Sequence, residues 1–192
     1  MATGFWTQGQ QQDPKRQYRF VANFTGLGNS GCSWFVKNVD KPNVSISEAS
    51  HEYLNHTFYY PGRISWNSVS VTFVDPVDPD ATATMMKAIE LAGYKIPTNA
   101  DDLGTLSKSK AIGELGDVII KQVDSEGAAI EEWRLNNAWI KSVNLSGLDY
   151  GGDSLSEVTV EIRYDWASLS AHGKTENVNG PAAKDAGVWT RS

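Results

Sequence analysis

Three glycines, Gly26, Gly28 and Gly31, form a G-x-G-x-x-G pattern directly after a stretch with strand periodicity. Such a loop binds the pyrophosphate of a dinucleotide when a helix follows it, because the helix N-terminus then faces the phosphates. The residues that follow here, 32–40, show no helical period and are rich in β-prone types. The pattern therefore favours a turn between strands, and we expect no nucleotide cofactor.

A second group, Asp75, Asp78 and Asp80, contains oxygen ligands of the kind that bind calcium. The central glycine and the distal bidentate glutamate of a calcium loop are both missing. Acidic residues and prolines just before a stretch of good helix formers are typical of a helix N-terminus. We therefore favour a capped helix start over a calcium site.

The histidines and the possible catalytic nucleophiles also indicate no metal site or active site. The three histidines do not share helical spacing, which makes a common metal ion improbable: His51, His56 and His172. The sequence contains no nucleophile elbow, P-loop or Cys–His pair of the kinds used in catalysis. We predict no catalytic, metal-binding or cofactor-binding residue.

The chain has 192 residues, a formal net charge of −6 and 40% hydrophobic residues. This balance is typical of one globular domain and excludes a wholly disordered or fibrous chain. An acidic chain is a poor candidate for gripping a phosphate backbone, because tight binding needs clustered basic residues. Cys32 is the only cysteine, so no disulfide can form within the chain. Since neither a secretory signal nor a membrane-spanning stretch is visible, we expect a soluble cytoplasmic protein.

Alternating hydrophobicity predicts a mainly β protein. The expected strands lie at 17–24, 34–36, 64–73, 117–124, 129–135, 139–145 and 157–166. A change of parity between Trp66 and Val69 indicates a β-bulge near Asn67. One helix is expected between Asp80 and Gly93, and 95–116 has the composition of a long loop with a short helical turn around 106–112.

The last expected strand has the most regular alternation. Its apolar face is expected to carry Val158, Val160, Ile162, Tyr164 and Trp166. Its polar face carries Glu157, Glu161 and Asp165. These carboxylates form either an ordinary solvated face or an acidic wall along a channel, and the pattern alone leaves both open.

Three stretches together resemble a known family. They are FYYPGRISWNSVSVTFVDP (58–76), the helix, and EEWRLNNAWIKSVNLSGLDYGGDSLSEVTVEIRYDWA (131–167). In their order and spacing they are similar to the tail tube proteins of contractile-tailed bacteriophages, of the T-even-like, myovirus type. The resemblance covers roughly residues 17–170. It adds no chemical fingerprint, since none of these stretches is an active-site motif.

The resemblance implies a small antiparallel β-sandwich or barrel with one flanking α-helix, a long hairpin loop and extended terminal arms. The expected organisation is an N-terminal arm at 1–16, a β domain at 17–170 and a flexible tail at 171–192. The implied function is structural and not enzymatic. Hexameric rings would stack into a conduit that sheath contraction drives through the host envelope for DNA ejection, with Glu157, Glu161 and Asp165 facing the lumen.

The implied partners are further copies of the chain, the tail sheath protein, baseplate and tail-terminator proteins, and the tape-measure protein. Genomic DNA would pass without tight binding, and no membrane anchor is expected. The protein would be assembled in the host cytoplasm and reside in the virion. Two alternatives stay open: the inner tube of a related contractile injection device, and a stand-alone binding module that uses the aromatic residues 58–60.

The segment 38–62 is β-prone, but its alternation is broken. It carries four aromatic residues among charges and histidines: Tyr53, Phe58, Tyr59 and Tyr60. A core strand would alternate more regularly, and a plain loop would carry fewer aromatics. We therefore predict a hairpin that projects from the domain and buries its aromatics only against a stacked ring.

Overall fold

The structure is a computed structural model that describes residues 14–27, 35–99 and 103–171. Within these ranges it contains ten strands and two helices. The strands are β1 Phe20–Phe24, β2 Val36–Val39, β3 Val44–Tyr53, β4 His56–Trp66, β5 Val69–Val74, β6 Val118–Val123, β7 Ala129–Asn136, β8 Trp139–Leu145, β9 Glu157–Arg163 and β10 Trp166–Ala171. The helices are α1 Ala81–Leu91 and α2 Lys108–Leu115. Gly28, Gly31, Cys32, His172 and most of the two expected arms lie outside the described residues.

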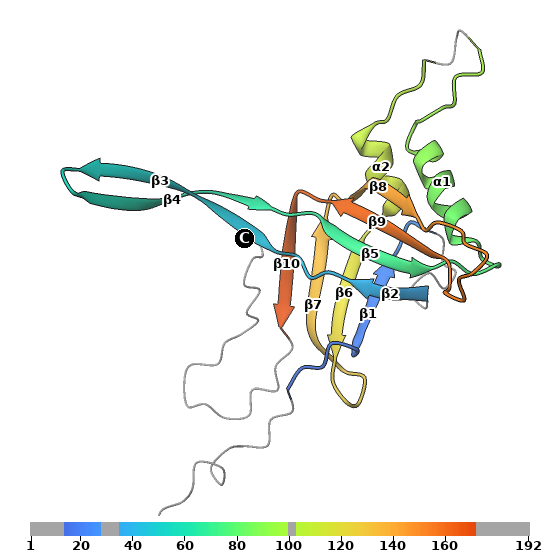
Figure 1. The fold of residues 1–192 in the computed structure, drawn as a ribbon, viewed down its shortest axis with the longest axis horizontal. Coiled ribbons are helices and arrows are strands. Elements are labelled where there is room, and N and C mark those ends of the chain that lie inside the picture. Colours follow the sequence, from blue (N-terminus) through green and yellow to red (C-terminus); the bar gives the residue numbers. More distant parts are fainter. Residues whose placement is uncertain (1–13, 28–34, 100–102, 172–192) are drawn as a thin grey trace, which may run out of the picture.

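Two four-stranded antiparallel sheets form a sandwich, which confirms the predicted fold class (Figure 1). One sheet has the order β1-β6-β7-β10 and the other the order β2-β5-β9-β8. Every second side chain of a strand points to the same face of its sheet. The side chains on the two inner faces therefore fill the space between the sheets. The buried side chains include Val69, Val71 and Phe73 of β5 and Val158, Val160 and Ile162 of β9. The rings of Phe24 and Phe73 lie 5.5 Å apart and join the two sheets.

The predicted helix start is confirmed. Asp80 is the N-cap of α1, and its carboxylate accepts a hydrogen bond from the backbone N–H of Ala83 at 2.8 Å. Asp75 accepts from the N–H groups of Ala81 and Thr82. Both carboxylates thus satisfy donors that a helix start leaves unpaired.

A second helix, α2, lies where a long loop with a short helical turn around 106–112 was expected, and it is longer than that turn. It begins after Ser107 and ends at Gly116, whose φ of +66° is accessible to glycine. Leu115 of α2 is buried with Met85 and Ala88 of α1 in the common core. The fold therefore has two flanking helices and not the expected one. The second has only eight residues and is stabilised by packing against α1 and β8.

Two strand boundaries also differ from expectation. The parity change at Asn67 is a break between β4 and β5, which pair with different strands, and not a bulge. The last expected strand ends at Arg163, and the chain then crosses to the opposite sheet as β10. Trp166 is consequently about half exposed, whereas Tyr164 stays buried as predicted.

Candidate functional site

The β3–β4 hairpin projects far beyond the sandwich, as predicted for this segment (Figure 1). Its ladder runs from Val44 opposite Trp66 to Tyr53 opposite His56, with a bulge after Ile46. Among the residues that the structure describes, the two strands pair only with each other, and no residue from 44 to 65 is buried. The hairpin therefore offers two open faces to a partner.

The register divides the four predicted aromatics between these faces. Ala49 lies opposite Tyr60, His51 opposite Phe58, and Tyr53 opposite His56. Directly paired residues share a face, so Tyr53, Phe58 and Tyr60 lie on one side of the tip. The rings of His56 and Phe58 lie 5.5 Å apart on this side. We call these three residues with His51 and His56 the aromatic face.

The opposite side of the tip is more polar. Ser50 pairs with Tyr59, Glu52 with Thr57, and Glu48 with Pro61. Tyr59 is therefore separated from the other three predicted residues by the thickness of the ladder.

The turn at the tip of the hairpin contains a strained backbone conformation. Leu54 has a φ of +54°, and its side chain is 89% exposed. A bulky residue rarely adopts a positive φ, and such outliers cluster at functional positions. No residue pattern around Leu54 predicted this conformation.

Both strands of the hairpin continue into the sandwich. β2 precedes β3, β5 follows β4, and β2 pairs with β5 in the sheet. At the junction the backbone N–H of Asn67 donates to the carbonyl of Asn43 at 3.0 Å, and their side-chain amides are also hydrogen-bonded. The hairpin is thus an extension of two paired strands and not a loose insertion.

Each of the three predicted acidic residues has a lysine partner. Glu157 pairs with Lys37, Glu161 with Lys141 at 2.8 Å, and Asp165 with Lys108 at 2.8 Å. Glu157 and Glu161 lie on the outward side of β9, and Asp165 lies in the crossing to β10.

Hydrogen bonds lower the pKa of two of these carboxyl groups. Those from Lys141 and Ser68 lower the pKa of Glu161. Those from Lys108 and Asn137 lower the pKa of Asp165. The surface is therefore a set of ion pairs rather than a row of unpaired carboxylates.

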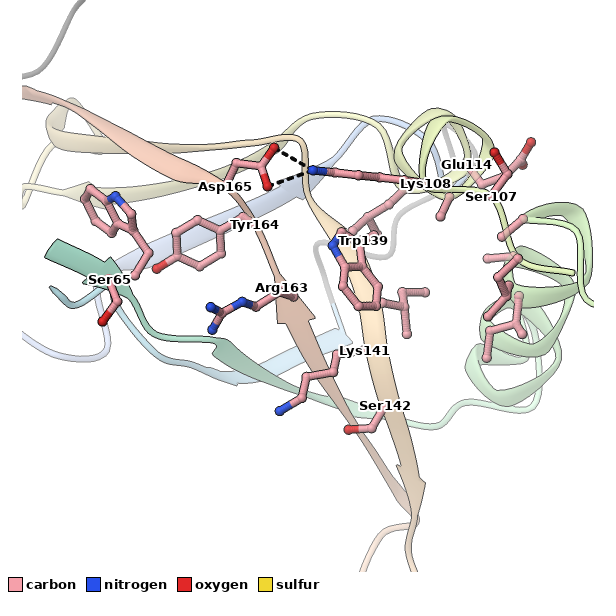
Figure 2. Close-up of a pocket in the computed structure, with 18 of the residues that line it drawn as sticks. Ser65, Ser107, Lys108, Glu114, Trp139, Lys141, Ser142, Arg163, Tyr164 and Asp165 are labelled. Atoms are coloured by element: carbon pink, nitrogen blue, oxygen red, sulfur yellow. Dashed lines mark hydrogen bonds and ion pairs between the residues drawn. The ribbon is translucent and has the colours of Figure 1, made fainter. Parts of the chain in front are cut away.

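A cavity of about 820 Å³ opens between the two helices and the sheet that contains β8 and β9. Its lining is mostly apolar, and it includes Ile64 and Trp66 at the hairpin root, Ile89 of α1, Leu106, Ala111 of α2, Trp139 and Ile140. Figure 2 shows Trp139 between the sheet and the helices, and Lys108 reaching across to Asp165. This cavity was not predicted from the sequence, because the segment around 106–112 indicated only a short helical turn, although Ser107 and Gly116 flank α2 as start and stop signals.

Tyr164 closes one end of the cavity beside Trp66, with ring centres 5.9 Å apart. It is 3% exposed, and its hydroxyl has no hydrogen-bond partner among the described residues. Burial raises the pKa of Tyr164 to about 12, against the opposing charge of Arg163.

A polar cluster around Glu131 ties the root of the hairpin to the other sheet. Glu131 is buried on β7 and accepts hydrogen bonds from Lys15, from Lys41 at 3.0 Å and from the indole N–H of Trp133. Lys41 lies just before β3 and also donates to the Gln122 side chain at 2.7 Å. Burial by itself raises the pKa of Glu131, but the three hydrogen bonds outweigh it and bring the value to about 2.

No helix among the described residues is long and apolar enough to cross a membrane. Within residues 14–27, 35–99 and 103–171, no group of three or more His, Cys, Asp or Glu side chains could hold a metal ion.

The sequence matches no protein-family model and no curated protein. The fold, by contrast, is similar to solved structures. A chain of the cryo-EM structure of the anti-feeding prophage cap (AFP tube terminating cap) has a TM-score of 0.62 and 16% identity, covering 89% of this chain and 99% of that one.

Two chains from an extracellular contractile injection system, PVC, are also similar. One, from the sheath/tube terminator in the extended state, has a TM-score of 0.61 and 14% identity over 84% of this chain and 100% of that one. Another, from the extended sheath-tube complex, has a TM-score of 0.59 and 13% identity over 82% and 92%. The chain thus shares its fold with chains of contractile injection particles.

Proposed function

We propose that this chain is a structural, non-enzymatic tube subunit of a contractile injection particle. The observation that carries the proposal is the projecting hairpin, which no part of the described chain covers. An isolated two-stranded hairpin is marginally stable in water. The hairpin is attached to the sandwich at one end and exposes several aromatic side chains. A second subunit that covers these side chains would explain their exposure.

The fold likeness supports the same proposal. The similar chains come from a sheath-tube complex and from tube-terminating assemblies. Sheath, baseplate and terminator proteins are therefore the partners we propose, with hexameric rings as the form of assembly.

A phage tail tube that conducts DNA is a narrower form of this function. It is supported by the sequence resemblance, in particular Pro61-Gly62-Arg63 before Trp66 and the closing Tyr164-Asp165-Trp166. If β9 lines the lumen, Glu157, Glu161 and Asp165 present ion pairs to the cargo. Arg163 is the one cation of β9, and it has no ion pair among the described residues. A surface with so few unpaired cations does not hold a polyanion tightly, so DNA could slide past it.

The test is assembly of the purified full-length chain, followed by light scattering and negative-stain electron microscopy over a range of concentrations. We expect six-fold rings, and tubes at high concentration. The matched control replaces residues 47–63 by Asn-Gly, which closes a two-residue hairpin between the paired residues Ile46 and Ile64 and removes no buried side chain. This variant should fold and remain monomeric. A wild-type chain that stays monomeric at every concentration would contradict the proposal.

A further inference from the structure

The cavity beside the helices is apolar surface that the described chain leaves uncovered. Ile64 is 54% exposed and Leu106 59% exposed, and both line it. Half-buried Ile89, Trp139 and Ile140 form its walls. Cavities of this volume, lined mainly by apolar and aromatic side chains, are typical of binding sites.

The hairpin tip of the same chain cannot fill this cavity. The ladder from Val44 to Tyr53 holds the tip about 30 Å from the hairpin root, at ~3.3 Å per residue. The root itself, with Ile64, Ser65 and Trp66, forms one wall of the cavity. A tip that reaches the cavity must therefore belong to another copy.

The chemistry of the tip suits the cavity. The aromatic face provides Tyr53, Phe58 and Tyr60, and Leu54 extends furthest from the root with its side chain almost fully exposed. These side chains are apolar over most of their surface and match the apolar lining.

The charges are complementary as well. Between residues 47 and 62 the hairpin has Glu48 and Glu52 and no lysine or arginine. Exposed Arg163 lines the cavity and makes no ion pair with any residue that the structure describes. Glu48 and Glu52 lie on the face opposite the aromatic face, so they do not enter the cavity with it. Their charge still steers the approaching tip toward the unpaired cation at the site.

We propose that the aromatic face of the hairpin tip of one copy docks into the cavity between α1, α2 and β8–β9 of a second copy. This inference rests on the proposed function and names the contact through which the subunits would assemble. The contact is heterologous, because each copy offers a hairpin on one side and a cavity on another. Such contacts close into rings or continue as filaments.

The experiment separates the two halves of this contact. Phe58→Asp places a charge on the aromatic face and leaves the cavity intact. Ala111→Trp fills the cavity from α2 and leaves the hairpin intact, because Ala111 is half-buried on the cavity wall. Each variant alone should raise the concentration at half-assembly roughly thirtyfold or more, as for the loss of a central interface residue.

Two matched variants act as controls. Tyr59→Asp adds the same charge to the opposite face of the hairpin. Lys110→Trp adds the same indole to α2 at an exposed position that does not line the cavity. Both should assemble within about threefold of the wild type. Arg163→Glu is a second cavity variant, useful if Ala111→Trp shows an altered circular dichroism spectrum or melting temperature.

A mixture of Phe58→Asp and Ala111→Trp gives the sharpest result. Only one productive contact is possible, between the hairpin of Ala111→Trp and the cavity of Phe58→Asp. Light scattering should therefore show a 1:1 dimer that does not grow further.

The remaining outcomes have distinct meanings. If the wild type assembles and both cavity variants assemble equally well, this inference is overturned while the proposed function stands. Equal effects of Phe58→Asp and Tyr59→Asp, or the absence of the mixed dimer, overturn it in the same way. A wild type that never assembles overturns both.

Discussion

The sandwich and the hairpin are built from the same kind of strand but bury their side chains in opposite ways. In β5, β6 and β9 every second residue is buried. In β3 and β4 not one residue is buried, although Val44, Ile46, Phe58 and Ile64 are as apolar as the core. The ladder of hydrogen bonds is common to both regions, so the difference lies in what covers the strands.

This difference shows which interactions hold each region in place. The sandwich is stabilised by apolar burial between its sheets. The hairpin is held at its root, by its continuation into β2 and β5 and by the Asn43–Asn67 contacts. We infer that substitutions in the two regions act on different equilibria: folding for the sandwich and assembly for the hairpin.

The largest effect is expected for a charge in the core. Ile162→Asp places a carboxylate between Val69 and Ile140, where the side chain is almost fully buried. An unpaired buried charge costs more than the whole stability of many domains, so this variant should not fold. Glu161→Gln, one residue away on the outward side, should fold normally. Circular dichroism and urea unfolding measure both, and equal behaviour would mean that the register of β9 is wrong.

Proteolysis compares the two regions in a single molecule. In the isolated subunit, cuts within 44–65 should be about a hundredfold faster or more than cuts in β5–β9, because open segments are cleaved through small local fluctuations. In assembled tubes the hairpin should become protected. Mass spectrometry of the fragments locates the cuts. Equal protection in both forms would mean that the hairpin packs within its own subunit.

A smaller effect is expected at the polar cluster that joins the two regions. Glu131→Gln removes the charge that Lys15 and Lys41 share, and should lower the free energy of unfolding by about 1–3 kcal/mol. Glu132→Gln is the matched control, since Glu132 pairs only with Lys121 among the described residues. It should stay within about 0.5 kcal/mol of the wild type. Urea unfolding at neutral pH decides between them.

Acid should remove the contribution of the same cluster. The pKa of Glu131 is lowered from 4.5 to about 2 on folding, so its stabilisation is complete above pH 4.5 and is lost as the pH falls toward 2. The stability difference between wild type and Glu131→Gln should therefore shrink over this range. A difference that is constant from pH 6 to pH 2.5 would show that the carboxylate charge is not what Lys15 and Lys41 stabilise.

The smallest effect is expected in the hairpin itself. Tyr59→Ser in the dilute, unassembled subunit should change the free energy of unfolding by less than about 0.5 kcal/mol, because the side chain contacts no core residue. Phe73→Ser, at a buried position of β5, should cost several times as much. Similar losses for both would mean that the hairpin contributes to the folded core.

Sequence periodicity predicted the elements in which buried and exposed residues alternate regularly or a local capping residue marks the end. The alternation in 118–123 and 157–163 and the Asp80 cap were sufficient for β6, β9 and α1. The broken alternation of 38–62 also predicted a projecting hairpin, since no single buried face was present. Local patterns were less informative where tertiary contacts decide. The segment around 106–112 indicated only a short turn of what is the helix α2, and nothing indicated that the chain leaves its sheet after Arg163, which places Trp166 in the opposite sheet.

The candidate site was predictable only in part. Four aromatic residues were identified, but their division into two faces depends on the register set by the bulge after Ile46. The cavity combines residues from the hairpin root, both helices and β8, and Glu131 meets partners 116 and 90 residues away. No pattern within one segment carries such information.

The continuation of β3 and β4 into β2 and β5 has a mechanical consequence. A pull on the tip along the hairpin axis is carried by two covalent strands in parallel and arrives at β5, which is held between β2 and β9. The interstrand hydrogen bonds lie across the direction of that pull, so they must yield together in shear instead of opening one after another. The hairpin is thus anchored as a tether that transmits tension into the centre of a sheet.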